Sequence, residues 1–265
     1  MVDTTSVETS EFELSVKTRN TAEIKSDDFL RMDNENSKTE SSSQIGFDPQ
    51  SAEDFERIEV IGQGSYGKVV LVRSKIDGPA ESRKLYALKV INKMKLAKID
   101  PELKSVKNEK VIMEKLSNLD CPYIVKMYNS FETDKNAYML LEYCPGGELY
   151  RLIQRSKRGL GPRLLKYYAA CLIVGLEVLH NNNVIYKDLK TENVVINENG
   201  MAILTDFGVS IHSFGQEDSF LDAEFKKKQI TPHISAPEVI ESQSFSQASD
   251  WFAFGCLLYE MAVGR

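Results

Sequence analysis

The sequence has few cysteines and no long apolar run, and both absences narrow the classes of protein to consider. Its four cysteines, Cys121, Cys144, Cys171 and Cys256, occur singly and without C-x-x-C spacing. This argues against a structural zinc site and fits reduced thiols in a cytoplasmic or nuclear protein. No apolar run is long enough to cross a bilayer and no segment reads as a signal peptide, so we expect no membrane span.

Large apolar residues are scarce over residues 1–54. This stretch holds 13 Asp and Glu against 5 Lys and Arg, together with 15 Ser and Thr. The net charge of residues 1–54 is −8, whereas that of the whole chain is −6, so residues 55–265 carry a net charge of +2. We expect a disordered, acidic, Ser/Thr-rich leader over 1–54, because such a composition buries too little apolar surface to offset the ordering of the chain. Its simplest role is a solvated extension, and a phosphorylated regulatory segment is the alternative.

The remaining residues, 55–265, divide into a strand-rich part and a helix-rich part. Short β-rich runs lie at Ile58–Ile61, Val69–Val72, Leu85–Ile91, Ile124–Phe131 and Tyr138–Glu142. Helices are predicted at Pro101–Leu116, where Asp100 can cap the helix and Pro101 suits its first position, and at Leu164–Leu179 and Asp250–Ala262. The pattern predicts an α+β fold of two lobes, 55–143 and 144–265, joined near 142–147.

A glycine-rich segment, Gly62-Gln63-Gly64-Ser65-Tyr66-Gly67, fits the phosphate-binding pattern G-x-G-x-x-G. Dinucleotide-binding proteins share this pattern, but they need a helix directly after the glycines. Here Lys68 to Val72 follows, and its β-branched residues predict a strand. The segment is therefore expected to be a hairpin that covers a nucleotide, because glycines allow the backbone to approach phosphates closely.

One lysine and one glutamate are candidates for a buried ion pair. Strand alternation places Ala87, Lys89 and Ile91 on one face, so that a flat base beside Ala87 would bring its phosphates within reach of Lys89. Glu109 lies on the apolar stripe of the following helix, which includes Val106, Met113 and Leu116. A carboxylate that faces inward needs a partner, and Lys89 is the natural one. An equally weighted alternative is that Glu109 is a partly exposed residue at the edge of this stripe.

The most informative stretch is Tyr186-Lys187-Asp188-Leu189-Lys190-Thr191-Glu192-Asn193, which is polar but precedes the apolar run Val194–Ile196. Phosphoryl transfer needs a carboxylate to position a hydroxyl, a cation for the γ-phosphate and an amide oxygen for Mg²⁺. A second strand-like run, Met201–Leu204, leads into Thr205-Asp206-Phe207-Gly208. A carboxylate at that strand end can reach a metal that bridges phosphates.

These motifs, taken in order, resemble the signature set of the eukaryotic protein kinases, and within them the AGC group that includes the cyclic-nucleotide-dependent kinases. The resemblance covers about Phe55 to Arg265 and implies a small antiparallel β lobe with one helix and a mainly helical second lobe. It matches Ser235–Glu238 to the segment that closes the activation loop. It matches Asp250-Trp251 to the start of the helix that anchors the catalytic loop.

The resemblance also implies a role for each motif residue. Asp188, Lys190 and Lys89 would be catalytic, as base, γ-phosphate lysine and phosphate-positioning lysine, and Asn193 and Asp206 would hold magnesium. The candidate nucleotide-site residues are Ile61, Gly62, Gln63, Gly64, Ser65, Tyr66, Gly67, Lys68, Val69, Ala87, Lys89, Glu109, Glu142, Cys144, Glu148, Glu192 and Val195. Within this set Glu142 and Cys144 would bond adenine through the hinge backbone. Glu148 and Glu192 match acidic positions that meet basic residues before the phosphoacceptor.

The sequence departs from the family in its catalytic and activation loops. Lys187 replaces an arginine and so loses the bidentate fork, and Thr191 replaces a proline. Lys226-Lys227-Lys228 stands where the group usually carries a phosphorylatable threonine. Order is then expected from Glu217 or Asp218, from a phosphate on Ser219, or from an activating partner. Because the resembled fold continues past the position of Arg265, a truncated C-lobe is also expected.

Two main hypotheses follow. The first is a serine/threonine protein kinase that moves the γ-phosphoryl of Mg-ATP onto protein substrates, which resemblance implies because Lys190 is the form typical of such kinases. The second is a truncated, non-catalytic kinase-like module that binds nucleotide or partners. A dinucleotide-binding oxidoreductase is a distant third. ATP, Mg²⁺ and protein substrates are the expected ligands, and nucleic acid is not expected among them.

Overall fold

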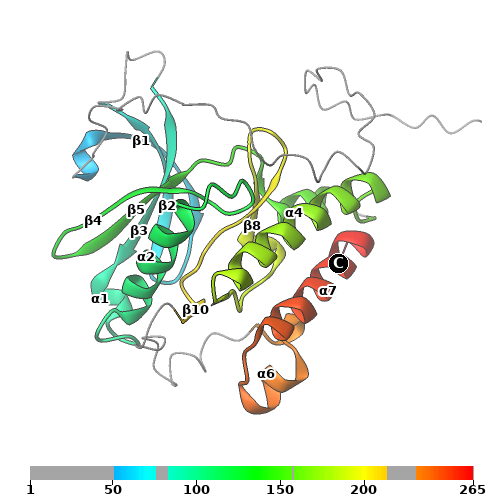
Figure 1. Cartoon of the computed structure of the whole chain (residues 1–265). Helices are drawn as coiled ribbons and strands as arrows, with labels where there is room; N and C mark the ends of the chain where they lie inside the picture. Colours follow the sequence, from blue (N-terminus) through cyan, green and yellow to red (C-terminus); the bar gives the residue numbers. More distant parts are fainter. Residues whose placement is uncertain (1–50, 76–82, 157, 214–230, 265) are drawn as a thin grey trace, which may run out of the picture. The chain divides into compact units, whose positions relative to one another are not determined.

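The computed structural model describes residues 51–75, 83–156, 158–213 and 231–264, within one unit, Gly46–Arg265 (Figure 1). Most of the predicted leader therefore lies outside the described residues. Its last residues form a short 3-10 turn, η2 (Ala52–Asp54), in which the Ser51 and Asp54 side chains bond each other's backbone N–H groups. This reciprocal cap leads directly into the first strand.

An antiparallel sheet forms the first lobe, with strand order β1-β2-β3-β5-β4. Its strands are β1 (Phe55–Gln63), β2 (Gly67–Ser74), β3 (Leu85–Asn92), β4 (Met127–Glu132) and β5 (Asn136–Glu142). All five predicted runs are confirmed, although Ile124 lies before β4 and instead bridges to Leu204. Successive residues of the central strands point to opposite faces, and both faces are covered, with Ala87, Ile91 and Leu141 in the main core and Tyr86 and Leu88 in a second core.

Two helices accompany this sheet, α1 (Lys93–Leu96) and α2 (Lys104–Ser117), so the prediction of a single helix was wrong by one short turn. The predicted start of the longer helix at Pro101 was also wrong. Leu103, just before α2, has a left-handed backbone with φ 53°. Asp100 does cap the helix, since its carboxylate accepts the backbone N–H of Lys104 and Ser105 at 2.9 and 2.8 Å, but it does so from four residues upstream.

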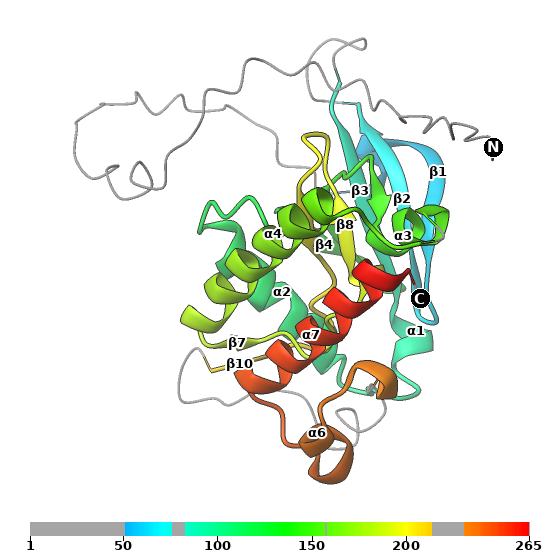
Figure 2. The same cartoon turned by 90° about the vertical axis from the view of Figure 1, so that its right-hand side faces the viewer.

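The second lobe is mainly helical, as predicted, and has α3 (Leu149–Ser156), α4 (Pro162–Asn181), α6 (Pro237–Ser242) and α7 (Gln247–Val263). Short strands β6 (Gly147–Glu148), β7 (Val184–Ile185), β8 (Val194–Ile196), β9 (Ala202–Leu204) and β10 (Ile211–His212) form two small sheets, with 3-10 turns η4 (Thr191–Asn193) and η5 (Pro232–Ile234). Figure 2 shows α4 and α7 side by side, and they are in contact. The two-lobed α+β fold is therefore confirmed.

A single large core connects the two lobes. It includes Met113 of α2, Met139 of β5, Leu172 of α4 and Leu257 of α7, all at most 2% exposed. Each such side chain contributes about 1.5–3 kcal/mol by leaving water. In the part of the chain that is described, no helix is both long and apolar enough to traverse a membrane.

The glycine segment is the hairpin turn between β1 and β2, where Gln63 pairs with Lys68. A Cβ on Gly67 would lie 2.2 Å from the carbonyl oxygen of Val90, whereas a Cβ on Gly64 would meet no atom within 4 Å. Neither residue has a positive φ. Packing therefore requires glycine at position 67 but not at position 64.

We expect Gly67→Ala to lower the free energy of unfolding by about 2 kcal/mol, because the added methyl group forces β2 and β3 apart. Gly64→Ala is the matched control and should be neutral or slightly stabilising, by up to about 1 kcal/mol. Denaturant unfolding of both variants measures the difference. Equal stabilities would contradict the close packing of Gly67 on β3.

Candidate active site

Lys89 of β3 and Glu109 of α2 form the predicted ion pair, with Nζ and Oε1 2.5 Å apart. Glu109 is 4% exposed, so the structure decides between the two alternatives in favour of a buried carboxylate. Burial raises the pKa of Glu109, and the charge of Lys89 only partly opposes this. Burial alone would lower the pKa of Lys89, but the neighbouring carboxylates of Asp206 and Glu109 raise it above its usual value. Lys89 therefore stays a cation throughout the physiological pH range.

Asp206 brings a second carboxylate to the same lysine, since its Oδ1 lies 2.9 Å from Lys89 Nζ. It follows β9 and has a left-handed backbone with φ 62°, which turns the chain between Thr205 and the fully buried Phe207. Lys89 lowers the pKa of Asp206 more than burial raises it, so the carboxylate stays charged. About half of its side-chain surface, 52%, is exposed and remains accessible to a ligand.

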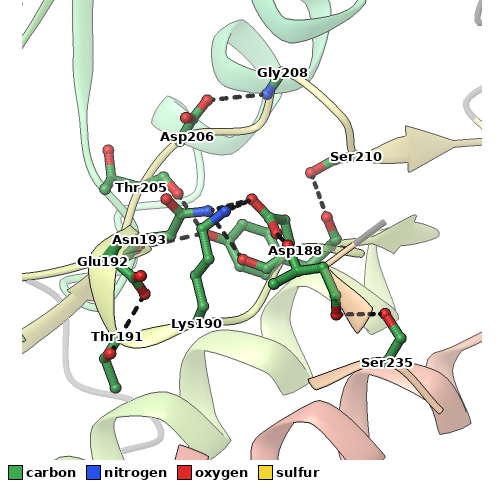
Figure 3. Close-up of polar contacts among 12 residues, drawn as sticks. Asp188, Lys190, Thr191, Glu192, Asn193, Thr205, Asp206, Gly208, Ser210 and Ser235 are labelled. Carbon is green, nitrogen blue, oxygen red and sulfur yellow. Dashed lines mark hydrogen bonds and ion pairs between the residues drawn. The ribbon is translucent and has the colours of Figure 1, made fainter. Parts of the chain in front are cut away.

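Asp188 is the centre of the polar network in the predicted catalytic loop (Figure 3). Its Oδ2 accepts hydrogen bonds from Lys190 Nζ at 2.5 Å and from Asn193 Nδ2 at 2.8 Å. Its Oδ1 accepts one from the Thr231 hydroxyl at 2.9 Å. Thr231 lies 43 positions after Asp188, so no spacing in the sequence marks this contact.

The catalytic loop is anchored by Asp250, a residue near the start of α7 whose exposed fraction is 1%. One of its oxygens accepts the backbone N–H of Lys187 at 2.8 Å, and the other accepts that of Tyr186 at 2.8 Å and contacts His180 Nε2 at 2.8 Å. The Tyr186 hydroxyl bonds the backbone carbonyl of Thr205, just before Asp206. Asp250 thus sets the backbone that carries Asp188, as the sequence predicted for this helix.

The lysine that replaces the usual arginine lies against an aromatic ring. Lys187 Nζ is 4.0 Å from the centroid of the Phe245 ring, which lies between α6 and α7. A compact ammonium suits this cation–π contact. Lys187 has φ 72°, so this residue combines a left-handed backbone with a side chain held by the α6–α7 connection. The predicted neighbours Glu217, Asp218, Ser219 and Lys226–Lys228 lie outside the described residues.

A cavity of about 300 Å³ connects the glycine hairpin to the catalytic loop. Ten of the predicted site residues line it, namely Gly64, Ser65, Tyr66, Gly67, Lys68, Val69, Lys89, Glu109, Asp188 and Asp206. Its volume is at the lower end of the range for small-molecule sites. The walls combine glycine backbone, two lysines and three carboxylates, which suits an anionic ligand accompanied by a divalent cation.

The residues predicted to contact adenine do not line this cavity. Several of them lie on paired strands. Ala87 lies opposite Leu141 in the β3–β5 pair, and Val195 of β8 lies opposite Glu148 of β6. Glu142 donates its backbone N–H to the carbonyl of Lys126 at 2.9 Å. Ile61, Gly62 and Gln63 complete the set on β1.

The thiol of Cys144, the cysteine of the hinge, is held in its protonated form. Burial and the nearby Glu142 raise the pKa of the Cys144 thiol to about 12. The thiol therefore remains protonated at neutral pH and is not a nucleophile.

The two predicted metal ligands, Asn193 and Asp206, both carry a side-chain oxygen that can bind a metal ion. The Asp206 carboxylate is half exposed, and Asn193 turns its amide nitrogen toward Asp188. Among the described residues the Asn193 side-chain oxygen makes none of the hydrogen bonds found, so it is available as a ligand. One carboxylate and one amide oxygen suit Mg²⁺, which binds few protein ligands and keeps its phosphates and water.

The acidic positions predicted to meet a substrate differ in their surroundings. Glu148 is paired with Arg151 of α3, at 3.1 Å. Glu192 is exposed in η4 beside Thr191, whose hydroxyl donates to Glu260 Oε1 of α7 at 2.9 Å. Burial, and then the charge of Glu192, raise the pKa of Glu260. Glu260 was missed from the sequence because it lies 68 positions after Glu192, and only its place in the otherwise uncharged run Trp251–Val263 could have marked it.

Comparison with known proteins agrees with this geometry. Residues 55–265 match the family described as "Protein kinase domain". The chain is 37% identical over 231 residues to serine/threonine-protein kinase Sgk1 of Danio rerio, covering 84% of this chain and 49% of that protein. It is 34% identical over 214 residues to cAMP-dependent protein kinase type 3 of Saccharomyces cerevisiae, covering 81% and 49%.

The chain therefore belongs to the protein kinase family. Its relatives are serine/threonine kinases of the AGC group, as the motifs indicated. The chain spans about half the length of these two relatives, and 23% of Protein kinase 3 of Dictyostelium discoideum, to which it is 37% identical over 221 residues.

We expect Asp250→Asn to lower the free energy of unfolding by about 2 kcal/mol, because an amide offers one acceptor where two backbone N–H groups now bind two oxygens. Any phosphotransfer should also fall, because the backbone that carries Asp188 loses an anchor. Asp134→Asn, in an exposed turn, is the control. Thermal and denaturant unfolding measure the change, and an unchanged midpoint for Asp250→Asn would contradict the anchoring role.

Proposed function

We propose that this chain transfers the γ-phosphoryl group of ATP to serine or threonine hydroxyls of protein substrates. The observation that carries the proposal is the placement of two charge clusters around one cavity. Lys89, Glu109 and Asp206 form one cluster, and Asp188 with Lys190 forms the other. This is the arrangement that positions phosphates on one side and a hydroxyl nucleophile on the other.

The catalytic loop supports specific roles for its residues. Asp188 accepts hydrogen bonds on both oxygens, one of them from a hydroxyl, so it can orient a substrate hydroxyl and accept its proton. Lys190 keeps a cation 2.5 Å from that carboxylate, where negative charge on the transferred group would develop. The Thr231 hydroxyl marks where a substrate hydroxyl can bind Asp188.

The glycine hairpin supports nucleotide binding. The fold requires glycine at position 67, but positions 62 and 64 have neither a positive φ nor a close backbone contact. Room for phosphates against the hairpin backbone is the remaining reason for glycine at these two positions. Ala87, Glu142, Cys144 and Val195 would then contact the base, from β3, the end of β5, the segment after it and β8.

Protein kinases use ATP with Mg²⁺. In this chain Asp206 and Asn193 would hold the metal, and their oxygen donors fit it. When bound, Mg²⁺ would supply positive charge that offsets the charge of the phosphates. Lys89 would meanwhile hold the phosphates, with Glu109 fixing its side chain in place.

Acidic residues near η4 support substrates with basic residues two or three positions before the acceptor. Glu148, Glu192 and Glu260 are on adjoining elements, β6, η4 and α7. They can pair with arginine or lysine through charge-assisted hydrogen bonds.

A cytoplasmic or nuclear location fits the four free thiols. An activating partner at the activation loop remains part of the proposal, because Lys226–Lys228 place three positive charges where the resembled group carries a phosphorylatable threonine.

The second candidate function is a non-catalytic module that binds nucleotide or partners. It would retain the ATP site without transferring phosphate. The presence of Asp188, Lys190, Asn193 and Asp206 with their contacts in place favours the catalytic function.

Asp188→Asn separates the two candidates. We expect this variant to lose at least about a hundredfold in transfer of radiolabelled phosphate to a basic serine peptide, because the amide cannot accept the hydroxyl proton. The rise in melting temperature on adding Mg-ATP should persist. Asp134→Asn should match the parent. If parent and Asp188→Asn transfer phosphate equally slowly while both bind ATP, the chain is a non-catalytic module.

Asp206→Asn tests the metal assignment. The substitution removes the carboxylate charge, so we expect transfer to fall by about two to three orders of magnitude and the magnesium concentration for half-maximal activity to rise. Nucleotide binding without metal should change less, because Lys89 and Glu109 remain. Magnesium titrations of the parent and the variant measure this, and coincident curves would exclude Asp206 as the ligand.

A further inference from the structure

The two acidic positions expected to meet a substrate carry different local charge. Glu148 ends the short strand β6, and Arg151 lies in the first turn of α3, three residues later. Arg151 Nε donates to Glu148 Oε2 at 3.1 Å, and their side chains are 61% and 31% exposed. The chain's own guanidinium therefore occupies the carboxylate that a basic substrate residue would need.

Glu192 has the opposite environment. Within the described part of the chain neither Glu192 nor Glu260 forms an ion pair. The single Thr191 hydroxyl donates to Glu260 at 2.9 Å and lies 3.4 Å from Glu192. Two carboxylates thus lie close together in one region of η4 and α7, where among the described residues neither is paired with a lysine or arginine. An incoming arginine would find negative charge there, but a locally neutral pair at Glu148.

We propose that Arg151 is a specificity-determining residue that masks Glu148, so that selection for basic substrate residues comes mainly from Glu192 and its neighbour Glu260. This inference rests on the proposed function. A substrate arginine that binds Glu148 must displace Arg151 and lie close to a second positive charge. The gain in binding free energy of a substrate arginine at Glu148 is therefore smaller than at a carboxylate without a bound cation.

The expected size of the effect follows from the exposure of the pair. Exposed ion pairs one helical turn apart are weak, and their removal changes an equilibrium by up to about fivefold. The effect must also diminish with salt, since the Debye length falls from about 10 Å at 0.1 M to about 3 Å at 1 M.

The test compares Arg151→Ala with Arg155→Ala, which removes the same charge one turn further along α3 from an exposed side chain. The substrates are four serine peptides with arginine two positions before the serine, three positions before it, at both positions, or at neither. The measurements are kcat and KM for each peptide in low and high salt, and the Kd of each labelled peptide by fluorescence anisotropy.

We expect Arg151→Ala to strengthen the preference for arginine at one of the two positions by about three- to fivefold, through KM and Kd rather than kcat. The gain should be absent in Arg155→Ala, should disappear in the double variant Arg151→Ala with Glu148→Gln, and should shrink in high salt. Glu192→Gln should instead weaken the preference that the parent already has.

Equal preferences in the parent, Arg151→Ala and Arg155→Ala would overturn the inference. So would a strong preference in the parent that Glu148→Gln alone removes, because Glu148 would then be accessible beside Arg151. Loss of all phosphotransfer with peptide binding intact would refute the proposed function instead, and the Kd values would still decide whether Arg151 masks Glu148.

Discussion

The arrangement of the whole site depends on one buried cation with two carboxylates. Lys89 belongs to β3, Glu109 lies 20 residues later on α2, and Asp206 lies 117 residues after Lys89. Removing Lys89 from this cluster would leave two carboxylates without their cation, and an uncompensated charge out of water costs about 3–5 kcal/mol. The two ion pairs therefore fix the positions of β3, α2 and the segment after β9 relative to one another, and the cavity beside them keeps its shape. Phe207, which is buried against Tyr186, connects the segment after β9 to the catalytic loop.

The sequence predicted most of the fold because its patterns are local. Alternation over Tyr86 to Ile91 needed no tertiary information, nor did the length and good helix formers of Leu164 to Leu179, and the structure confirms them as β3 and α4. The turn after β1 could be assigned because the residues after the glycines are β-branched. The start of α2 was predicted less accurately, because Asp100 caps this helix across an intervening turn rather than from the adjacent position.

The parts that could not be predicted depend on contacts between distant segments. The stripe on α2 left Glu109 between an inward and an edge position, and only its packing beside β3 settles the matter. Thr231 and Glu260 reach the catalytic loop from later in the chain, so no spacing in the sequence marks them. The Arg151–Glu148 pair is local in sequence. Its effect on substrate binding, however, depends on how its charge compares with that of the carboxylates on η4 and α7, which are distant in sequence. The roles of individual site residues likewise follow from family resemblance until they are measured.

The contact between Lys89 and Asp206 has a thermodynamic consequence. Under the proposed function, phosphates that bind Lys89 would weaken its pairing with Asp206 and add negative charge beside this carboxylate. A divalent cation at Asp206 would remove that repulsion. Each ligand would then raise the affinity for the other by the same factor, as linkage requires. The ion pair would thus make nucleotide and metal bind as a cooperative couple.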